Sequence, residues 1–197
     1  MYYTIKRWND IFLCLIGGIL LLPIFLGIMA CIKIESRGPI FFKQKRVGIH
    51  KTYFEILKFR TMRIDTPKDT PTHLLKNPEQ YITKVGKFLR KTSLDELPQI
   101  INILKGDMSI VGPRPALWNQ EDLIEEREKY GANDVLPGLT GWAQINGRDE
   151  IPIVKKAKLD GFYVKHFSFR MDLICFLRTI ISVLRKEGVK EGGTGKD

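Results

Sequence analysis

Cysteine and histidine are scarce in this sequence, and they show none of the spacing that metal sites or disulfide bonds require. The 197 residues include three of each. Cys14, Cys31 and Cys175 are odd in number and form no C-x-x-C pair, so the sequence supports neither a disulfide framework nor a zinc site. The histidines lie far apart, without ligand spacing. We therefore expect a reduced protein that faces the cytosol.

The sequence also lacks the marks of two common binding classes. The Gly-Gly-Thr-Gly-Lys stretch at 192–196 is not a P-loop, because Lys190 stands where the first glycine of that motif belongs and Asp197 where a serine or threonine belongs. The basic residues are scattered through alternating apolar segments, without a basic helix or an aromatic recognition motif. Nucleic acid is therefore not an expected partner.

Positive charge is concentrated in the first half of the chain. The net charge is +10. Residues 1–91 contain 17 Lys and Arg against 6 Asp and Glu, whereas the remainder contains 15 against 16. The longest apolar run lies in the same half. This arrangement predicts contact with an anionic membrane face, an anionic substrate, or both.

The apolar run covers residues 11–32 and contains no charge. It is long enough for a helix that crosses the hydrocarbon core, which needs about 20 residues. Pro23 near its middle predicts a kink. Positive residues flank both ends of the run, so its two ends have no clear difference in charge. The run therefore fits either a spanning helix or a re-entrant helix that bends at Pro23 and leaves the membrane by the face through which it entered. A signal peptide is not favoured, since no small-x-small cleavage site follows.

Two segments, 40–47 and 53–59, predict a β-hairpin through the glycine-containing connection 48–51. The second strand runs into a basic stretch that places Lys58, Arg60 and Arg63 close together, although cations at a strand end are often only solvated. Residues 64–78, rich in Thr, Pro, Asp and Lys, predict a loop and a candidate lid.

Asp95 and Glu96 are adjacent carboxylates near the start of a predicted helix, 93–105, that ends at Gly106. They suggest a site for phosphate and a metal ion, but Ser93-x-x-Glu96 is also a capping box, and acidic first turns are common. Neighbouring helical residues point about 100° apart, so the two carboxylates should have different roles. The stripe expected to face the core is Leu94, Leu97, Ile101 and Leu104.

Arg114 stands between Pro113 and Pro115, which restrict the backbone that presents it. This favours a clamp for phosphate oxygens, with an exposed arginine in a proline-rich turn as the alternative. Residues 137–148 form a glycine-rich loop whose backbone N–H groups would be able to approach an anion and whose Gln144 would be able to hydrogen-bond. Trp142 of this loop is expected to pack in the core rather than to stack on a base.

The last predicted helix, 171–186, has one apolar face with basic residues beside it. Both a core helix and a membrane-surface helix fit, and the basic flank favours the membrane surface. Asp172 at its start is either a first-turn acid or a third carboxylate for the site. The apolar face consists of Leu173, Ile174, Leu177, Ile180, Ile181 and Leu184.

Taken together, these segments closely resemble the bacterial sugar transferase family, the monotopic phosphoglycosyl transferases. The matching motifs lie at 58–62, 93–99, 105–109, 112–115 and 137–148, and with the first helix they cover nearly the whole chain. The resemblance implies transfer of a sugar phosphate from a UDP-sugar to polyprenol (undecaprenyl) phosphate with release of UMP. It implies the cytoplasmic face of the bacterial inner membrane as the location, and the first membrane step of glycoconjugate assembly as the role.

The resemblance also assigns roles to residues. It implies that Asp95 is a nucleophile that forms a covalent aspartyl-phosphosugar intermediate in a ping-pong scheme, and that Glu96 helps to hold Mg²⁺. Carboxylates do attack phosphoryl groups, and a hard cation with oxygen ligands neutralises a pyrophosphate. The residues that we expect to contact substrate are Lys58, Arg60, Arg114, Gln144, Arg148 and Asp172.

The predicted fold class is α+β and mainly helical. Residues 1–36 are expected to form a membrane-inserted re-entrant helix, because that of the family is re-entrant. Leu22 precedes Pro23 where the family has serine. Residues 37–197 are expected to form a cytosolic, membrane-associated catalytic domain with a small β-hairpin, a central catalytic helix and amphipathic membrane-surface helices.

Two other functions remain as alternatives. A non-catalytic, membrane-anchored basic adaptor for anionic lipid or nucleic acid would explain the charge and the apolar run, but not the acidic pair. A membrane diphosphatase would use water in place of the polyprenol phosphate. Membrane lipid is an expected partner in each case, downstream glycosyltransferases are possible partners of the transferase, and the sequence does not identify the sugar.

Overall fold

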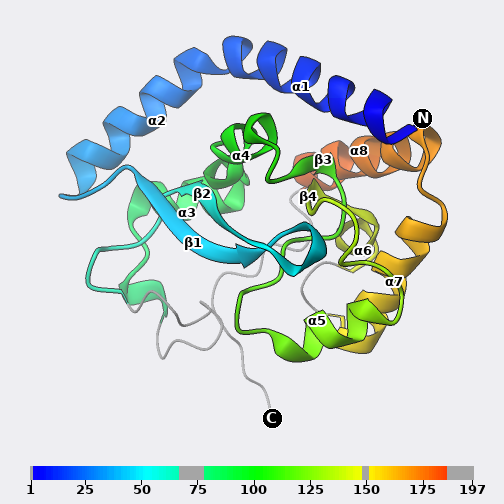
Figure 1. Cartoon of the computed structure of the whole chain (residues 1–197). Coiled ribbons are helices and arrows are strands. Elements are labelled where there is room, and N and C mark those ends of the chain that lie inside the picture. The colour runs from blue at the N-terminus through cyan, green and yellow to red at the C-terminus, as the bar shows by residue number, and fades with distance from the viewer. Residues whose placement is uncertain (1, 67–77, 148–150, 186–197) are drawn as a thin grey trace.

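The computed structural model describes residues 2–66, 78–147 and 151–185 (Figure 1). This part of the chain is mainly helical with two small strand pairs, which confirms the predicted fold class in outline. The helices and strands are α1 (Tyr2–Leu20), α2 (Leu22–Glu35), β1 (Phe41–Val47), β2 (Tyr53–Phe59), α3 (Lys84–Lys91), α4 (Gln99–Lys105), β3 (Ser109–Val111), α5 (Glu121–Glu128), β4 (Gly138–Thr140), α6 (Trp142–Ile145), α7 (Ile153–Lys165) and α8 (Phe169–Leu184). Short 3₁₀ turns are η1 (Ile49–Lys51), η3 (Pro78–Gln80) and η4 (Leu94–Glu96).

Helices α1 and α2 form one bent arm that arches over the rest of the chain (Figure 1). They are bent by 63° across a break at Leu21. Pro23 lies in the first turn of α2, where the missing N–H of proline costs no helical hydrogen bond. The predicted kink is therefore confirmed, just before the proline. Among the described residues no single helix has the length and apolar character of a membrane span, whereas this bent pair has both when taken together.

The β-hairpin is confirmed. β1 and β2 pair antiparallel from Phe41 opposite Phe59 to Val47 opposite Tyr53. Phe59 contacts Phe41 and also Phe25 of α2, with ring centroids 5.7 and 5.3 Å apart. The hairpin is thus packed beneath the second half of the arm.

The helix predicted from Ser93 is divided at Pro98. A 3₁₀ turn, η4, comes first and α4 follows, while the predicted end at Gly106 is confirmed by its left-handed φ of 97°. The division changes which side faces inward, so the predicted stripe is wrong at Ile101, which is 37% exposed. Gln99 and Asn102 are buried instead.

Asn102 is buried because it completes the open edge of β2. Its side-chain amide donates to Glu55 O at 2.8 Å and accepts from Leu57 N–H at 2.9 Å. A polar side chain thus takes the place of a third strand beside the hairpin, and it fixes α4 next to the end of β2.

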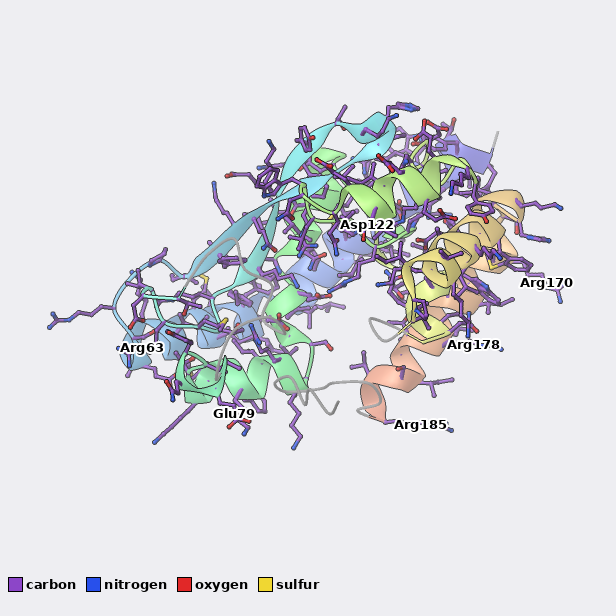
Figure 2. The ribbon with its side chains drawn as sticks, turned by 90° about the horizontal axis from the view of Figure 1, so that it is seen from below. Arg63, Glu79, Asp122, Arg170, Arg178 and Arg185 are labelled. Carbon is purple, nitrogen blue, oxygen red and sulfur yellow. The ribbon has the colours of Figure 1, made fainter. Side chains whose placement is uncertain are left out.

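Helices α7 and α8 lie on the side of the molecule away from α2 and α3 (Figure 1). α7 was not predicted, and its buried Asp160 forms an ion pair of 2.6 Å with Arg127 of α5. α8 turns Met171 and Cys175 inward, whereas Leu173 and Leu177 of the predicted apolar face are 44% and 50% exposed. That face therefore does not belong to the core. Figure 2 shows the labelled Arg170, Arg178 and Arg185 spaced along this side of the molecule.

Several predictions concern residues outside the described part of the chain. The proposed lid spans 64–78, of which residues 67–77 are not described, and the same holds for Arg148 and for the 192–196 tail. The arm ends at Glu35, close to the predicted boundary at residue 36. The division of the chain into two domains stays a prediction.

Candidate active site

The acidic pair lies in η4, between α3 and α4. Ser93 before it has a left-handed backbone with φ 56°, and its side chain makes no capping hydrogen bond. The capping-box prediction is therefore wrong, because the left-handed serine does not cap the turn and the carboxylate of Glu96 is engaged elsewhere. The two carboxylates need a different explanation.

Glu96 is held by two cations from separate elements. Its Oε1 accepts from Lys58 Nζ at 2.7 Å and from Arg114 Nη2 at 2.8 Å. Burial by itself would raise the pKa of Glu96, but Arg114 and Lys58 together hold that pKa far below its usual range. Glu96 therefore stays ionised, and the structure brings three of the predicted site residues into one cluster.

Asp95 has the opposite environment. It forms no hydrogen bond or ion pair with any described residue. Burial raises the pKa of the Asp95 carboxyl, and the neighbouring charge of Glu96 adds to this, while Lys58, Arg90 and Arg114 oppose it. Such a carboxylate keeps its lone pairs available for an electrophile, since no donor within the described ranges uses them.

Arg90 is a cation of this site that the sequence reasoning missed. It lies in the last turn of α3, and its Nε donates to Thr61 Oγ1 at 2.9 Å. The signal that would have found it is the basic end of a helix placed directly before the acidic pair. Cations favour helix C-termini for electrostatic reasons as well, so that signal by itself is weak.

Arg114 is presented by tightly packed backbone. Gly138 N–H donates to Pro113 O at 2.9 Å, and Gly112 N–H donates to Thr140 O at 2.8 Å. A Cβ atom at Gly138 would lie 2.1 Å from Gly112 N, so only glycine permits this approach. The expectation that the glycines of the 137–148 loop present their N–H groups to an anion is wrong for Gly138, whose N–H already donates to Pro113 O.

Two residues predicted to contact substrate lie in other clusters. Arg60 is buried and donates to the carbonyl oxygens of Ser36 and Arg37 at 2.8 and 2.7 Å, so it secures the end of α2. Asp172 accepts hydrogen bonds from Lys6 Nζ at 2.6 Å and, at 2.6 and 2.7 Å, from the hydroxyls of Tyr2 and Tyr163. Both therefore have structural partners.

Gln144 lies in α6, and both polar atoms of its amide are buried without a partner in the described structure. Unpaired buried amides are costly, so this side chain remains a reasonable candidate for a substrate contact. Trp142 in the same helix stacks on Phe162 at a centroid distance of 5.3 Å, in agreement with the expected packing role.

The described residues contain no group of three or more His, Cys, Asp or Glu side chains that would enclose a metal ion. Mg²⁺ commonly binds through one or two carboxylates, completed by water and by substrate phosphates. Glu96 supplies one such carboxylate, and its low pKa keeps it ionised. The donor set therefore fits a magnesium ion that arrives with a diphosphate.

The sequence is similar to those of several known bacterial proteins. The sequence profile described as bacterial sugar transferase matches residues 1–186. An uncharacterised sugar transferase, EpsL, of Bacillus subtilis is 44% identical over 168 residues, which cover 85% of this chain and 81% of EpsL. The UDP-glucose:undecaprenyl-phosphate glucose-1-phosphate transferase of Escherichia coli is 40% identical, over 92% of this chain and 41% of that protein.

A third relative is named for a different sugar. The UDP-N-acetylgalactosamine-undecaprenyl-phosphate N-acetylgalactosaminephosphotransferase of Aeromonas hydrophila is 35% identical, over 96% of this chain and 46% of that protein. The chain thus spans less than half the length of the two relatives named for their substrates.

Proposed function

We propose that this chain, which belongs to the bacterial sugar transferase family, transfers a sugar phosphate from a UDP-sugar to undecaprenyl phosphate and releases UMP. The names of two relatives support this reaction. The observation that carries the proposal is the acidic pair. Glu96 is engaged by two cations, whereas Asp95 beside it has no partner among the described residues.

In the proposed mechanism Asp95 is the nucleophile. Its carboxylate oxygen attacks the sugar-bearing phosphorus, and the bond from that phosphorus to the bridging oxygen breaks with departure of UMP. An oxygen of undecaprenyl phosphate then attacks the same phosphorus and releases the Asp95 carboxylate. Lys58 and Arg114, which share Glu96 in the structure, are placed to bind the phosphate oxygens of the UDP-sugar.

We assign Glu96 as the residue that would hold Mg²⁺. The ion, when bound, would neutralise charge on the diphosphate. Glu96 suits this role because its low pKa keeps it ionised throughout the physiological range, and because only one of its two oxygens accepts from Lys58 and Arg114.

The arm and α8 give the proposed location. The arm has the length and apolar composition for insertion, and its bend of 63° is compatible with a re-entrant helix. α8 exposes an apolar face with arginines nearby (Figure 2). We therefore place the acidic pair at the cytoplasmic surface of the membrane, where a lipid phosphate is within reach.

The test is UMP release from a panel of UDP-sugars with undecaprenyl phosphate and Mg²⁺. At least one sugar should give turnover, and Asp95→Asn should abolish it. Asp122→Asn, which changes an exposed carboxylate on α5 (Figure 2), is the control and should retain it. Without lipid acceptor, about one equivalent of UMP is expected per enzyme, as covalent catalysis requires. Continuous release without acceptor would indicate a diphosphatase, and activity in Asp95→Asn would refute the nucleophile.

A further inference from the structure

Asp10 is a buried carboxylate in the first half of the arm, just before its long apolar stretch. It is 4% exposed, and it accepts hydrogen bonds from Ser109 Oγ at 2.6 Å and from Ile110 N–H at 3.3 Å. Burying a carboxylate is unfavourable unless such bonds compensate for the lost water. Both oxygens of Asp10 are used by the same short strand, β3, so the arm and β3 are held together at this point.

The chain between β3 and Arg114 has little freedom. Only Gly112 and Pro113 separate the end of β3 from Arg114. The Tyr163 hydroxyl, which donates to Asp172, packs against Val111 with its oxygen 3.1 Å from Val111 O, and a Cβ at Gly112 would lie 2.4 Å from a carbonyl oxygen of the facing loop. A displacement of β3 would therefore be passed on to the guanidinium of Arg114.

The arm holds the other half of the site as well. Arg7, one turn before Asp10, donates to the carbonyl oxygens of Ile103 and Leu104 at 2.5 and 2.9 Å. These residues lie near the end of α4, the helix that follows the turn bearing Glu96. The inner side of α1 thus contacts β3, which precedes Arg114, and α4, which follows the turn bearing Glu96. Arg114 and Glu96 themselves meet at 2.8 Å.

We propose that Asp10 is a positioning residue: through Ser109 and Ile110 it sets where β3 places Arg114 relative to Glu96. The effect of Asp10 on turnover rests on the proposed transfer reaction, in which Arg114 binds phosphate oxygens. Asp10 itself does not touch the acidic pair. It acts through the strand, and this makes the geometry of the phosphate clamp depend on how α1 is seated.

The test is a double-mutant cycle in the full-length protein. Asp10→Asn keeps one acceptor oxygen and loses the other, and Ser109→Ala removes a single hydrogen bond, so it serves if Asp10→Asn folds poorly. Each should raise the KM for the UDP-sugar by about tenfold with a smaller change in kcat, as expected for a misplaced binding group. In an Arg114→Ala background the same changes should have almost no further effect, because no guanidinium remains to be positioned.

A matched control is Asp160→Asn, which alters another buried carboxylate, paired with Arg127 between α5 and α7. The fold-changes in KM caused by Asp160→Asn and by Arg114→Ala should multiply in the double variant, because the two sites act independently. If the fold-changes in KM caused by Asp10→Asn and by Arg114→Ala also multiply, the positioning role is overturned and Asp10 only supports the fold.

A second double-mutant cycle, measured in unfolding free energy, needs no turnover. Asp10→Asn and Glu96→Gln should be coupled, because Asp10 holds the strand that brings Arg114 to Glu96. Additive losses of stability would overturn the inference. Coupling in a protein that transfers no sugar would instead refute the proposed function and leave the placement of Arg114 by Asp10 supported.

Discussion

Asp95 and Glu96 are neighbouring carboxylates whose surroundings shift their pKa values in opposite directions. Burial raises the pKa of Asp95, whereas Arg114 and Lys58 outweigh burial at Glu96 and lower its pKa. Pairs of titratable groups with diverging pKa values are typical of sites in which the two groups have different tasks. The divergence here supports a nucleophile beside a metal ligand, and it leads to opposite predictions for the two neutral variants.

Asp95→Asn should stabilise the protein at neutral pH. The folded-state pKa of Asp95 lies above the unfolded value, so its ionisation costs folding free energy as the pH rises through the unfolded pKa, and the amide removes this cost. We expect a gain of about 1 kcal/mol, or about 2–4 °C in the thermal midpoint at pH 7. Thermal unfolding followed by circular dichroism measures this. A lower midpoint than wild type would contradict it.

Glu96→Gln should destabilise the protein, because it leaves Lys58 and Arg114 without their shared partner. We expect a loss of about 1–3 kcal/mol at pH 7 by denaturant unfolding. The folded-state pKa of Glu96 is depressed, so its contribution is present above the unfolded pKa and is lost as the pH falls through the folded pKa. The difference between variant and wild type should therefore shrink in acid.

The control for Glu96 is Glu55→Gln. The ion pair of Glu55 with Lys43 joins side chains that are 64% and 59% exposed, and such pairs contribute about 0–1 kcal/mol. A loss at Glu55 as large as that at Glu96 would show that charge alone, without the arrangement around the acidic pair, accounts for the effect.

At the scale of elements, the side-chain amide of Asn102 joins α4 to the hairpin by two hydrogen bonds. Asn102→Ala removes the partners of Glu55 O and Leu57 N–H, and we expect a loss of about 2–4 kcal/mol in unfolding free energy. Turnover should fall as well, because Lys58 follows Leu57 directly in β2. Ile101→Ala changes the exposed neighbour on the same helix and should cost far less. Equal losses would contradict the bridging role of Asn102.

The elements that the sequence predicts correctly are those with local signals. The hairpin, the kink near Pro23 and the helix end at Gly106 each depend on residues a few positions apart. β3 and β4 were missed because each has only three residues and finds its partner through glycines that allow close backbone approach. The sequence predicts a helix start at Ser93 because the capping pattern begins there. In the structure a 3₁₀ turn follows Ser93, and α4 begins only after Pro98.

The sequence predicts which residues form the site better than it predicts their contacts. Asp95, Glu96, Lys58 and Arg114 were identified from motif and charge, and three of them meet as direct partners. Predictions of substrate contacts for distant charges had less support. The partner of Asp172 is Lys6, 166 positions away in sequence, and no local pattern reports such a pairing.

At the scale of the whole molecule, the exposed apolar face of α8 predicts attachment to lipid in addition to the arm. Replacing Leu173 and Leu177 by glutamine removes two exposed leucines without touching the buried Met171 and Cys175. Binding to vesicles that contain anionic lipid should weaken by about 100-fold, because each CH₂ group that no longer enters the membrane loses about 0.8 kcal/mol and the two changes remove about four such groups. Cosedimentation with vesicles measures this. Unchanged binding would show that the apolar face of α8 does not contact lipid.

The arm is also part of the fold, and this limits how the protein can be simplified. Cys14 of α1 packs with Ile103 and Met108, both fully buried, while Glu35 at the end of α2 accepts hydrogen bonds from the first N–H groups of α3. A shortened version that begins after residue 36 would expose that core to water and free both α3 and β3. Removing the arm to obtain a shorter protein would therefore remove the support of the acidic pair along with it.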